Sequence, residues 1–235
     1  MKKYSYIGVS FIVLIFGILF FPKIMDRIDG NSINNDTRLN NSKELSFIKM
    51  NDEKKKVPDF VFLNQDSLFI GNEDFLGKVF VVEFFFTSCP SICIEMNKNM
   101  KILDKEFGER EDFGIASFTI DPKHDTPKVL KEYAELLEIK SKNWHFLTGN
   151  ISDIYDLSNS GFNIFSSINP DIAGGFEHQG FFALIDQNGY IRSRDNGMGS
   201  PIVYYLGIED ENSDKQGVDM IKEDILKIGK RFERN

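Results

Sequence analysis

The sequence predicts an α/β fold in which helices cover both faces of a mixed central sheet. Two neighbouring segments are the basis of this prediction. Residues 79–86 form a nearly unbroken apolar run, which is typical of a central strand that is buried on both faces. In the segment 92–107 the apolar residues recur at spacings of four, four, three and four, which is the period of an amphipathic helix.

Shorter patterns predict the elements on either side of this pair. Residues 60–63 and 68–70 flank a polar turn and indicate an opening hairpin at the amino-terminal end of the domain. A further strand is expected at 113–120. Thr126 then fits a helix N-cap with Pro127 in the first turn, which predicts a helix to about residue 139.

The remaining third of the chain completes the pattern. We expect a strand at 144–147, a short helix at 151–159, a loop at 160–180, a strand at 181–185, a late hairpin that turns at 188–189 into a strand at 190–192, and a closing helix at 218–228. Strand, helix, strand and helix, followed by a hairpin and a helix, is the order of a thioredoxin-like fold.

Residues 1–21 are predicted to form a membrane anchor. Residues 4–21 carry no charge, and at about 1.5 Å per residue they span roughly 27 Å, close to the ~30 Å hydrocarbon core. No small-residue cleavage site follows them, so an uncleaved anchor is favoured over a signal peptide. Lys2 and Lys3 favour a cytoplasmic amino terminus. We therefore expect a single-pass protein of the inner (cytoplasmic) membrane, with its soluble domain facing the periplasm or the extracytoplasmic side.

Composition divides the rest of the chain and excludes one class of partner. Residues 22–56 are polar and lack periodicity, which predicts a flexible linker between the anchor and a folded domain at 57–235. The formal net charge is −8, and no basic stripe is present. We therefore expect no nucleic-acid partner.

The two cysteines of the chain, Cys89 and Cys93, lie where the predicted central strand meets the long helix. Ligand sites in such sheets lie just beyond the carboxyl ends of the strands. With Pro90 as the first helical residue, Cys89 is expected at the N-cap, where the helix dipole favours a thiolate. Cys93 then follows one turn later on the same face. The expected Cβ separation of about 5–6 Å exceeds the ~3.8 Å of a disulfide, which favours a metal without excluding redox chemistry.

The donor types indicate copper. Soft thiolates select Cu(I), whereas a structural zinc site normally has four protein ligands. Of the three histidines, His178 lies in a glycine-rich loop just before a strand, and a flexible loop can bring it over the cysteines. Two thiolates and one imidazole form a three-coordinate site for Cu(I), and for Cu(II) with a further ligand. His124 and His145 are expected to have surface or packing roles.

Four further side chains have two interpretations each. Asp121 follows a neighbouring strand and is expected either behind the metal ligands or as a turn carboxylate. Glu83 interrupts a buried strand, and pairing with a lysine is favoured over a role as a proton-relay acid. Met96 and Met100 fall on the apolar stripe of the helix, so core packing is favoured over copper ligation.

Several motifs resemble, in order, those of the Sco/SenC family of copper-binding proteins. They are Gly77-Lys78-Val79 with the run from Phe86 to Cys93, Thr119-Ile120-Asp121-Pro122-Lys123-His124-Asp125-Thr126-Pro127, Trp144-His145-Phe146-Leu147-Thr148-Gly149, and Glu177-His178 before Leu184-Ile185-Asp186. The resemblance covers about residues 57–230. It implies a membrane-tethered thioredoxin-like domain that binds one copper through Cys89, Cys93 and His178.

The same resemblance implies a function and a partner. Such proteins assist maturation of the binuclear copper centre of cytochrome c oxidase, so the expected partner is its copper-bearing subunit or another copper-receiving protein. The alternative is a thiol–disulfide oxidoreductase that reduces the cysteines of that partner, with Cys89 as nucleophile. His178 separates the two functions, because copper needs it and thiol exchange does not.

Overall fold

The computed structural model describes residues 10, 13–18, 20–21, 45–195 and 200–229 of the 235-residue chain. The chain divides into two units, 1–43 and 44–235. The described residues of the first unit are helical, and the rest of the predicted anchor, like most of the predicted linker, lies outside the described residues. Within the described ranges, no helix has the length and apolar character needed to cross a membrane.

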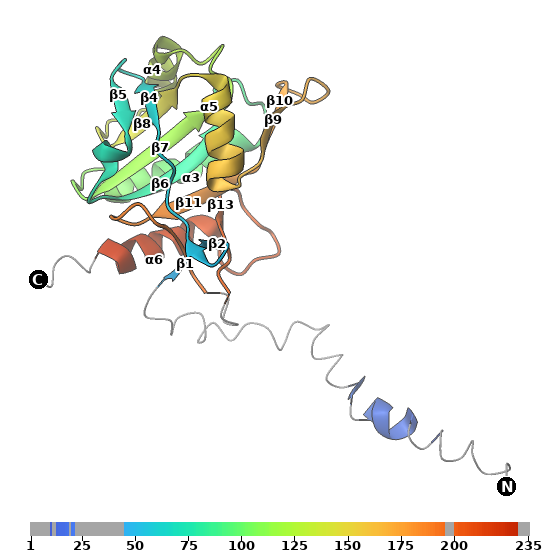
Figure 1. The fold of residues 1–235 in the computed structure, drawn as a ribbon. Coiled ribbons are helices and arrows are strands. Elements are labelled where there is room, and N and C mark those ends of the chain that lie inside the picture. Colours follow the sequence, from blue (N-terminus) through green and yellow to red (C-terminus); the bar gives the residue numbers. More distant parts are fainter. Residues whose placement is uncertain (1–9, 11–12, 19, 22–44, 196–199, 230–235) are drawn as a thin grey trace, which may run out of the picture. The chain divides into compact units, whose positions relative to one another are not determined.

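The second unit is built on a mixed sheet with the strand order β1-β12-β11-β6-β7-β8-β4-β5, and β13 pairs with β11 (Figure 1). The strands are β1 (Ser46–Phe47), β4 (Val61–Asn64), β5 (Phe69–Gly71), β6 (Val79–Phe85), β7 (Phe113–Thr119), β8 (Trp144–Thr148), β11 (Phe181–Ile185), β12 (Ile191–Ser193) and β13 (Tyr205–Leu206). Strands β6, β7 and β8 are parallel, and the remaining neighbours are antiparallel. The mixed α/β sheet and both predicted hairpins are confirmed.

The predicted helices are also present. They are α3 (Ile92–Phe107), α4 (Pro127–Leu136), α5 (Ile151–Asp156), which continues as the π-helical segment η2 (Leu157–Phe162), and α6 (Gly217–Gly229), and a 3₁₀ turn, η1 (Asn72–Phe75), follows β5. Thr126 is the N-cap of α4, and its side chain accepts a hydrogen bond from Val129 N at 3.5 Å. Pro127 occupies the first turn, as predicted, because its missing N–H removes no helical hydrogen bond there.

Strand β6 separates two apolar layers because its side chains alternate between the faces of the sheet. On one face Phe85 stacks on Tyr133 of α4, with ring centroids 5.8 Å apart. On the other face Phe84 meets Phe162 of η2, with centroids 5.7 Å apart. The α5–η2 segment therefore covers the face opposite α4, and Figure 1 shows α5 in front of the sheet and α3 behind it.

Residues from Leu45 onward already belong to the folded unit, before the predicted boundary at residue 57. Strand β1 pairs with β12, and the short strands β2 (Lys49–Met50) and β3 (Glu53–Lys54) pair with each other. The buried Arg192 donates hydrogen bonds to Leu45 O and, at 2.8 Å, to Asp186 Oδ2. Strands of two residues are too short to produce a periodic pattern, so residues 45–56 resembled a linker in the sequence.

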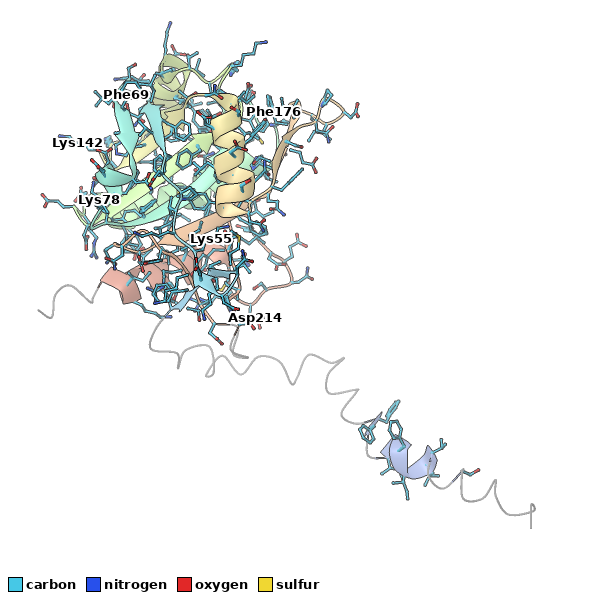
Figure 2. The ribbon with its side chains drawn as sticks, viewed as in Figure 1. Lys55, Phe69, Lys78, Lys142, Phe176 and Asp214 are labelled. Carbon is cyan, nitrogen blue, oxygen red and sulfur yellow. The ribbon has the colours of Figure 1, made fainter. Side chains whose placement is uncertain are left out.

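A second hairpin lies within the predicted loop 160–180. Strands β9 (Ser166–Ile168) and β10 (Phe176–His178) pair antiparallel, with His178 opposite Ser166. Figure 2 labels Phe176 on this hairpin, on the opposite side of the domain from Phe69 of the edge strand β5. His178 is therefore the last residue of a strand and does not lie in a loop.

Candidate metal centre

The two cysteines lie on the turn that joins β6 to α3. Cys89 N donates to Phe86 O at 3.3 Å, which closes a tight turn directly after the central strand. The helix begins at Ile92 with Ser91 as N-cap, so the predicted position of Cys89 at the N-cap is wrong by two residues. Cys93 is in the first turn of α3 and is almost fully buried.

Asp125 fixes the position of this turn. Its side chain is fully buried in the loop between β7 and α4, and Oδ2 accepts hydrogen bonds from Thr87 N at 3.0 Å and Thr119 Oγ1 at 2.5 Å. Thr87 Oγ1 donates to Oδ1, and the His124 ring lies 2.8 Å from the same oxygen. Sequence reasoning gave Asp125 no role. The signal was its place in the motif 119–127, directly before the N-cap of α4.

The β9–β10 hairpin brings His178 over the cysteine turn. The His178 ring makes an edge contact with Phe86, with centroids 5.9 Å apart, and Phe176 packs on Phe86 at 5.3 Å. Gly174, with φ of +91°, lies so close to Phe86 and Pro90 that an added Cβ would be 3.0 Å from each. A glycine is required at this contact by both its backbone angle and its lack of a side chain.

These elements bring together the three side chains predicted as ligands. The Sγ atoms of Cys89 and Cys93 and a ring nitrogen of His178 all lie within 4.8 Å of one another. Cys93 Sγ is 3.1 Å from His178 Nε2, and His178 Nδ1 is 3.4 Å from Gln179 O. For Nε2 to bind a metal, the ring proton must lie on Nδ1, where Gln179 O can accept it.

The two thiols differ strongly in acidity. A hydrogen bond from Cys93 is the largest of the effects that lower the pKa of Cys89, to about 3, and His178 contributes in the same direction. Burial and the neighbouring Cys89 raise the pKa of Cys93 well above its ordinary value. Two like charges this close are unfavourable, so the metal-free pair holds a single thiolate, and that thiolate is Cys89.

The remaining predicted residues make turn or packing contacts. Asp121 accepts from the His124 backbone N–H at its carbonyl, 3.1 Å, and at Oδ1, 3.4 Å, and these hydrogen bonds belong to its own turn. His145 contacts the ring of Phe75, with centroids 5.8 Å apart. Met96 and Met100 are fully buried in the core, as predicted.

Glu83 is a buried acid beneath the site, and the predicted lysine pairing is wrong. Its Oε1 accepts from Ser117 Oγ at 2.6 Å, and Trp144 Nε1 donates to the same hydroxyl at 2.9 Å. Within the described part of the chain, Oε2 has no hydrogen-bond partner. Burial raises the pKa of Glu83 to about 7, and its charge in turn contributes to raising the pKa of Cys93.

The donor set suits a soft metal ion. Two ligands of one ion, each about 2.0–2.3 Å from it, lie at most about 4.6 Å apart. The three donor atoms already satisfy or approach this limit, since all lie within 4.8 Å. Two sulfurs and an imidazole nitrogen are donors of the kind that Cu(I) prefers. A small side-chain adjustment therefore completes a three-coordinate site.

Fold and site together define a class: a thioredoxin-like domain with a Cys-Cys-His cluster at the carboxyl ends of its central strands. The model of the SCO1/SenC family matches residues 48–207, more than half of the chain. The chain belongs to the SCO1/SenC family.

Individual relatives agree with this assignment. The SCO1 protein homolog of Bacillus subtilis is 34% identical over 145 residues, which are 61% of this chain and 75% of that protein. A SCO1/SenC family lipoprotein from Bacillus anthracis has a TM-score of 0.62 at 31% identity, with 74% of this chain and 95% of that chain covered. BsSco, described as a member of the Sco family of cytochrome c oxidase assembly proteins with a disulfide switch, has a TM-score of 0.60 at 30% identity, covering 74% and 93%.

The buried acid generates a prediction about stability. Because the pKa of Glu83 is raised by burial, folding stability is highest when the carboxyl is protonated and falls as pH rises from about 4.5 through 7. A shift of this size corresponds to about 3 kcal/mol. Urea unfolding of the reduced, metal-free Glu83→Gln variant should lack this decline, whereas the exposed control Glu111→Gln should retain it. A decline of equal size in all three proteins would contradict the assignment.

The unequal thiols generate a second prediction. Iodoacetamide at pH 6 should label Cys89 of the reduced, metal-free chain well before Cys93, because the thiolate is the nucleophile. In the Cys93→Ala variant, which removes the hydrogen-bond donor, the pH profile for labelling of Cys89 should move to higher pH. Peptide mass spectrometry over a pH series measures both effects. Equal labelling rates at the two cysteines would reject the single-thiolate description.

Proposed function

We propose that this chain is a copper chaperone that binds one copper ion through Cys89, Cys93 and His178. The observation that carries the proposal is the convergence of these donors within 4.8 Å, from a turn, a helix and a hairpin. The family assignment supports the next step, assistance to the maturation of the binuclear copper centre of cytochrome c oxidase. The copper-bearing subunit of that oxidase, or another copper-receiving protein, is the proposed partner.

The surroundings of the donors suit copper as cargo. Cys89 and Cys93 are buried, whereas His178 is half-buried and lies on a two-stranded hairpin. Copper displaces the proton that remains on Cys93, so its binding relieves the unfavourable proximity of two sulfurs that cannot ionise together without it. The imidazole on the hairpin is the donor most accessible to a receiving protein. Cu(I) fits the three donors, and Cu(II) fits them with an added ligand.

Substitution of the donors tests the proposal. The full chain in neutral detergent should bind one copper, with thiolate-to-copper absorption in the Cu(II) form. Cys89→Ser and Cys93→Ser should abolish this band, and His178→Ala should weaken affinity by more than about 100-fold, because even outer partners of metal ligands are worth about 10–100-fold. The matched control His145→Gln should retain stoichiometry and spectrum. If either serine variant keeps both, the ligand assignment is wrong.

Thiol–disulfide exchange is a second candidate, favoured by the unequal pKa values of the two thiols. In this reaction the Cys89 thiolate attacks a partner disulfide and releases one partner thiolate. Cys93 then gives up its proton and attacks Cys89 in the mixed disulfide, which leaves a Cys89–Cys93 disulfide and a reduced partner. The His178→Ala variant separates the two functions. If it reduces a model disulfide at the wild-type rate but no longer binds copper, thiol exchange does not depend on the copper site.

We further propose a topology for the whole chain, supported by residues 4–21 and by the lipoprotein relative from Bacillus anthracis. Residues 1–21 anchor the protein in the inner (cytoplasmic) membrane, a linker follows, and the copper-binding domain faces the periplasm or the extracytoplasmic side. Asp121 is proposed to support the metal site from the loop between β7 and α4.

A fusion experiment tests this topology. Alkaline phosphatase is active only outside the cytoplasm, so a fusion after Asn235 should be active. Green fluorescent protein fused at the same position should be dark, because it does not fluoresce when it is exported in the unfolded state. Mass spectrometry of the mature protein should find residues 1–21 retained. A processed amino terminus would reject the uncleaved anchor.

A further inference from the structure

A groove of about 590 Å³ runs along the outer face of α3, next to the metal centre. One wall comes from α3, through Ile94, Lys98, Lys101, Ile102, Asp104 and Lys105. The other wall comes from the segment after α4, through Leu137, Glu138, Ile139 and Lys140. The groove lies entirely within the folded unit 44–235, and its residues were not part of any predicted site.

The floor of the groove is apolar and partly open to solvent. Ile94 is 66% exposed and Ile102 is 39% exposed, although both lie on a helix whose opposite stripe is fully buried. Leu137 and Ile139 are half-buried on the facing wall. Apolar side chains that line a concave surface with polar residues around it are a common feature of protein interaction sites.

The rim carries positive charge on an acidic protein. Four lysines line the groove against two acids, whereas the whole chain has a formal net charge of −8. Lys101 lies 3.8 Å from Glu138. Within the described residues, Lys98, Lys105 and Lys140 have no carboxylate within ion-pair distance. A complementary ligand therefore presents carboxylates beside an apolar stripe.

The position of the groove links it to metal transfer. Its first residue, Ile94, directly follows the proposed ligand Cys93 on the same helix. From Ile94 to Lys105 the groove follows α3 for about 16 Å, or three helical turns, at ~1.5 Å per residue. A helix laid along this length would hold the rest of its protein beside the metal centre.

We propose that this groove docks an acidic amphipathic helix of the protein that receives copper from the site. The proposal rests on the proposed function and adds the chemistry of the partner. Leucine-like side chains at i, i+3, i+4 and i+7 fill the apolar floor, and glutamates or aspartates on their flanks meet Lys98, Lys105 and Lys140. A concave groove of three turns fits a helix better than it fits the flat surface of an anionic membrane.

Synthetic peptides test the proposal on the full chain in neutral detergent. The probe is a fluorescent helical peptide of about 14 residues with an apolar stripe flanked by glutamates. Two matched peptides serve as controls. One has lysines in place of the glutamates, and the other has the same composition in an order that removes the apolar stripe. Fluorescence anisotropy should give tightest binding for the first peptide, with the other two weaker by about tenfold or more. Equal binding of all three would overturn the proposal.

Variants identify the surface and separate this proposal from the copper site. The double variant Lys98→Glu/Lys105→Glu should weaken the acidic peptide about tenfold, and Ile102→Ser should weaken it to a similar extent. The control Lys128→Glu/Lys142→Glu makes the same change of charge outside the groove and should have little effect. Copper stoichiometry, measured on the same samples, should stay at one throughout. If the wild type binds no copper, the proposed function is rejected. If the groove variants bind both copper and the acidic peptide as the wild type does, only the groove proposal is rejected.

Other occupants would give different results. Addition of phosphatidylserine to the micelles should change the affinity for the acidic peptide by less than about twofold. If the lipid abolished peptide binding, the groove would be identified as a lipid-binding surface. Sedimentation of the full chain should show no dimer that depends on the groove. A dimer that is lost in the groove variants would identify a second copy of the chain as the occupant. Either result would overturn the proposal.

Discussion

The parallel pairing of β6 with β7 is the constraint on which the rest of the structure depends. The strands match residue for residue from Val79 opposite Phe113 to Phe85 opposite Thr119, so both end at the same edge of the sheet. All of these side chains are buried, and a slip of one residue would exchange the two faces of each strand. The fixed register therefore brings the turn after β6 beside the loop after β7.

At this edge a single buried carboxylate joins the two connections. Asp125 accepts hydrogen bonds from the backbone and the hydroxyl of Thr87 and from Thr119, and it is fully excluded from solvent. Loss of one partner from such a network leaves a buried polar group without compensation, which is why these networks hold a single arrangement. Asp125 thus fixes the cysteine turn through Thr87 and not through either sulfur.

The third donor reaches the site from a separate hairpin. His178 lies on a two-stranded hairpin that meets the turn through Phe176 and the His178 ring, both packed on Phe86, and through the close approach of Gly174. The site therefore combines two donors on a rigid frame with one on a small peripheral hairpin. The hairpin is itself tied to η2, because the buried Ser166 Oγ lies 2.8 Å from Ser158 Oγ and the Ser166 backbone pairs with the Asn159 side chain.

The sequence by itself determined the central strands and the long helices, and it singled out the three side chains that the structure brings together. Continuous apolar runs and regular apolar spacing reflect burial directly, and cysteines separated by three residues at a strand end have few structural uses. Only the tertiary structure decided the start of α3, the hairpin that carries His178, the role of Asp125 and the inclusion of residues 45–56 in the domain. Each of these depends on contacts between residues far apart in the chain, such as Arg192 with Leu45 or Thr87 with Asp125. Such contacts leave no periodic pattern in the sequence, because each of them needs only a single polar pair or a single glycine.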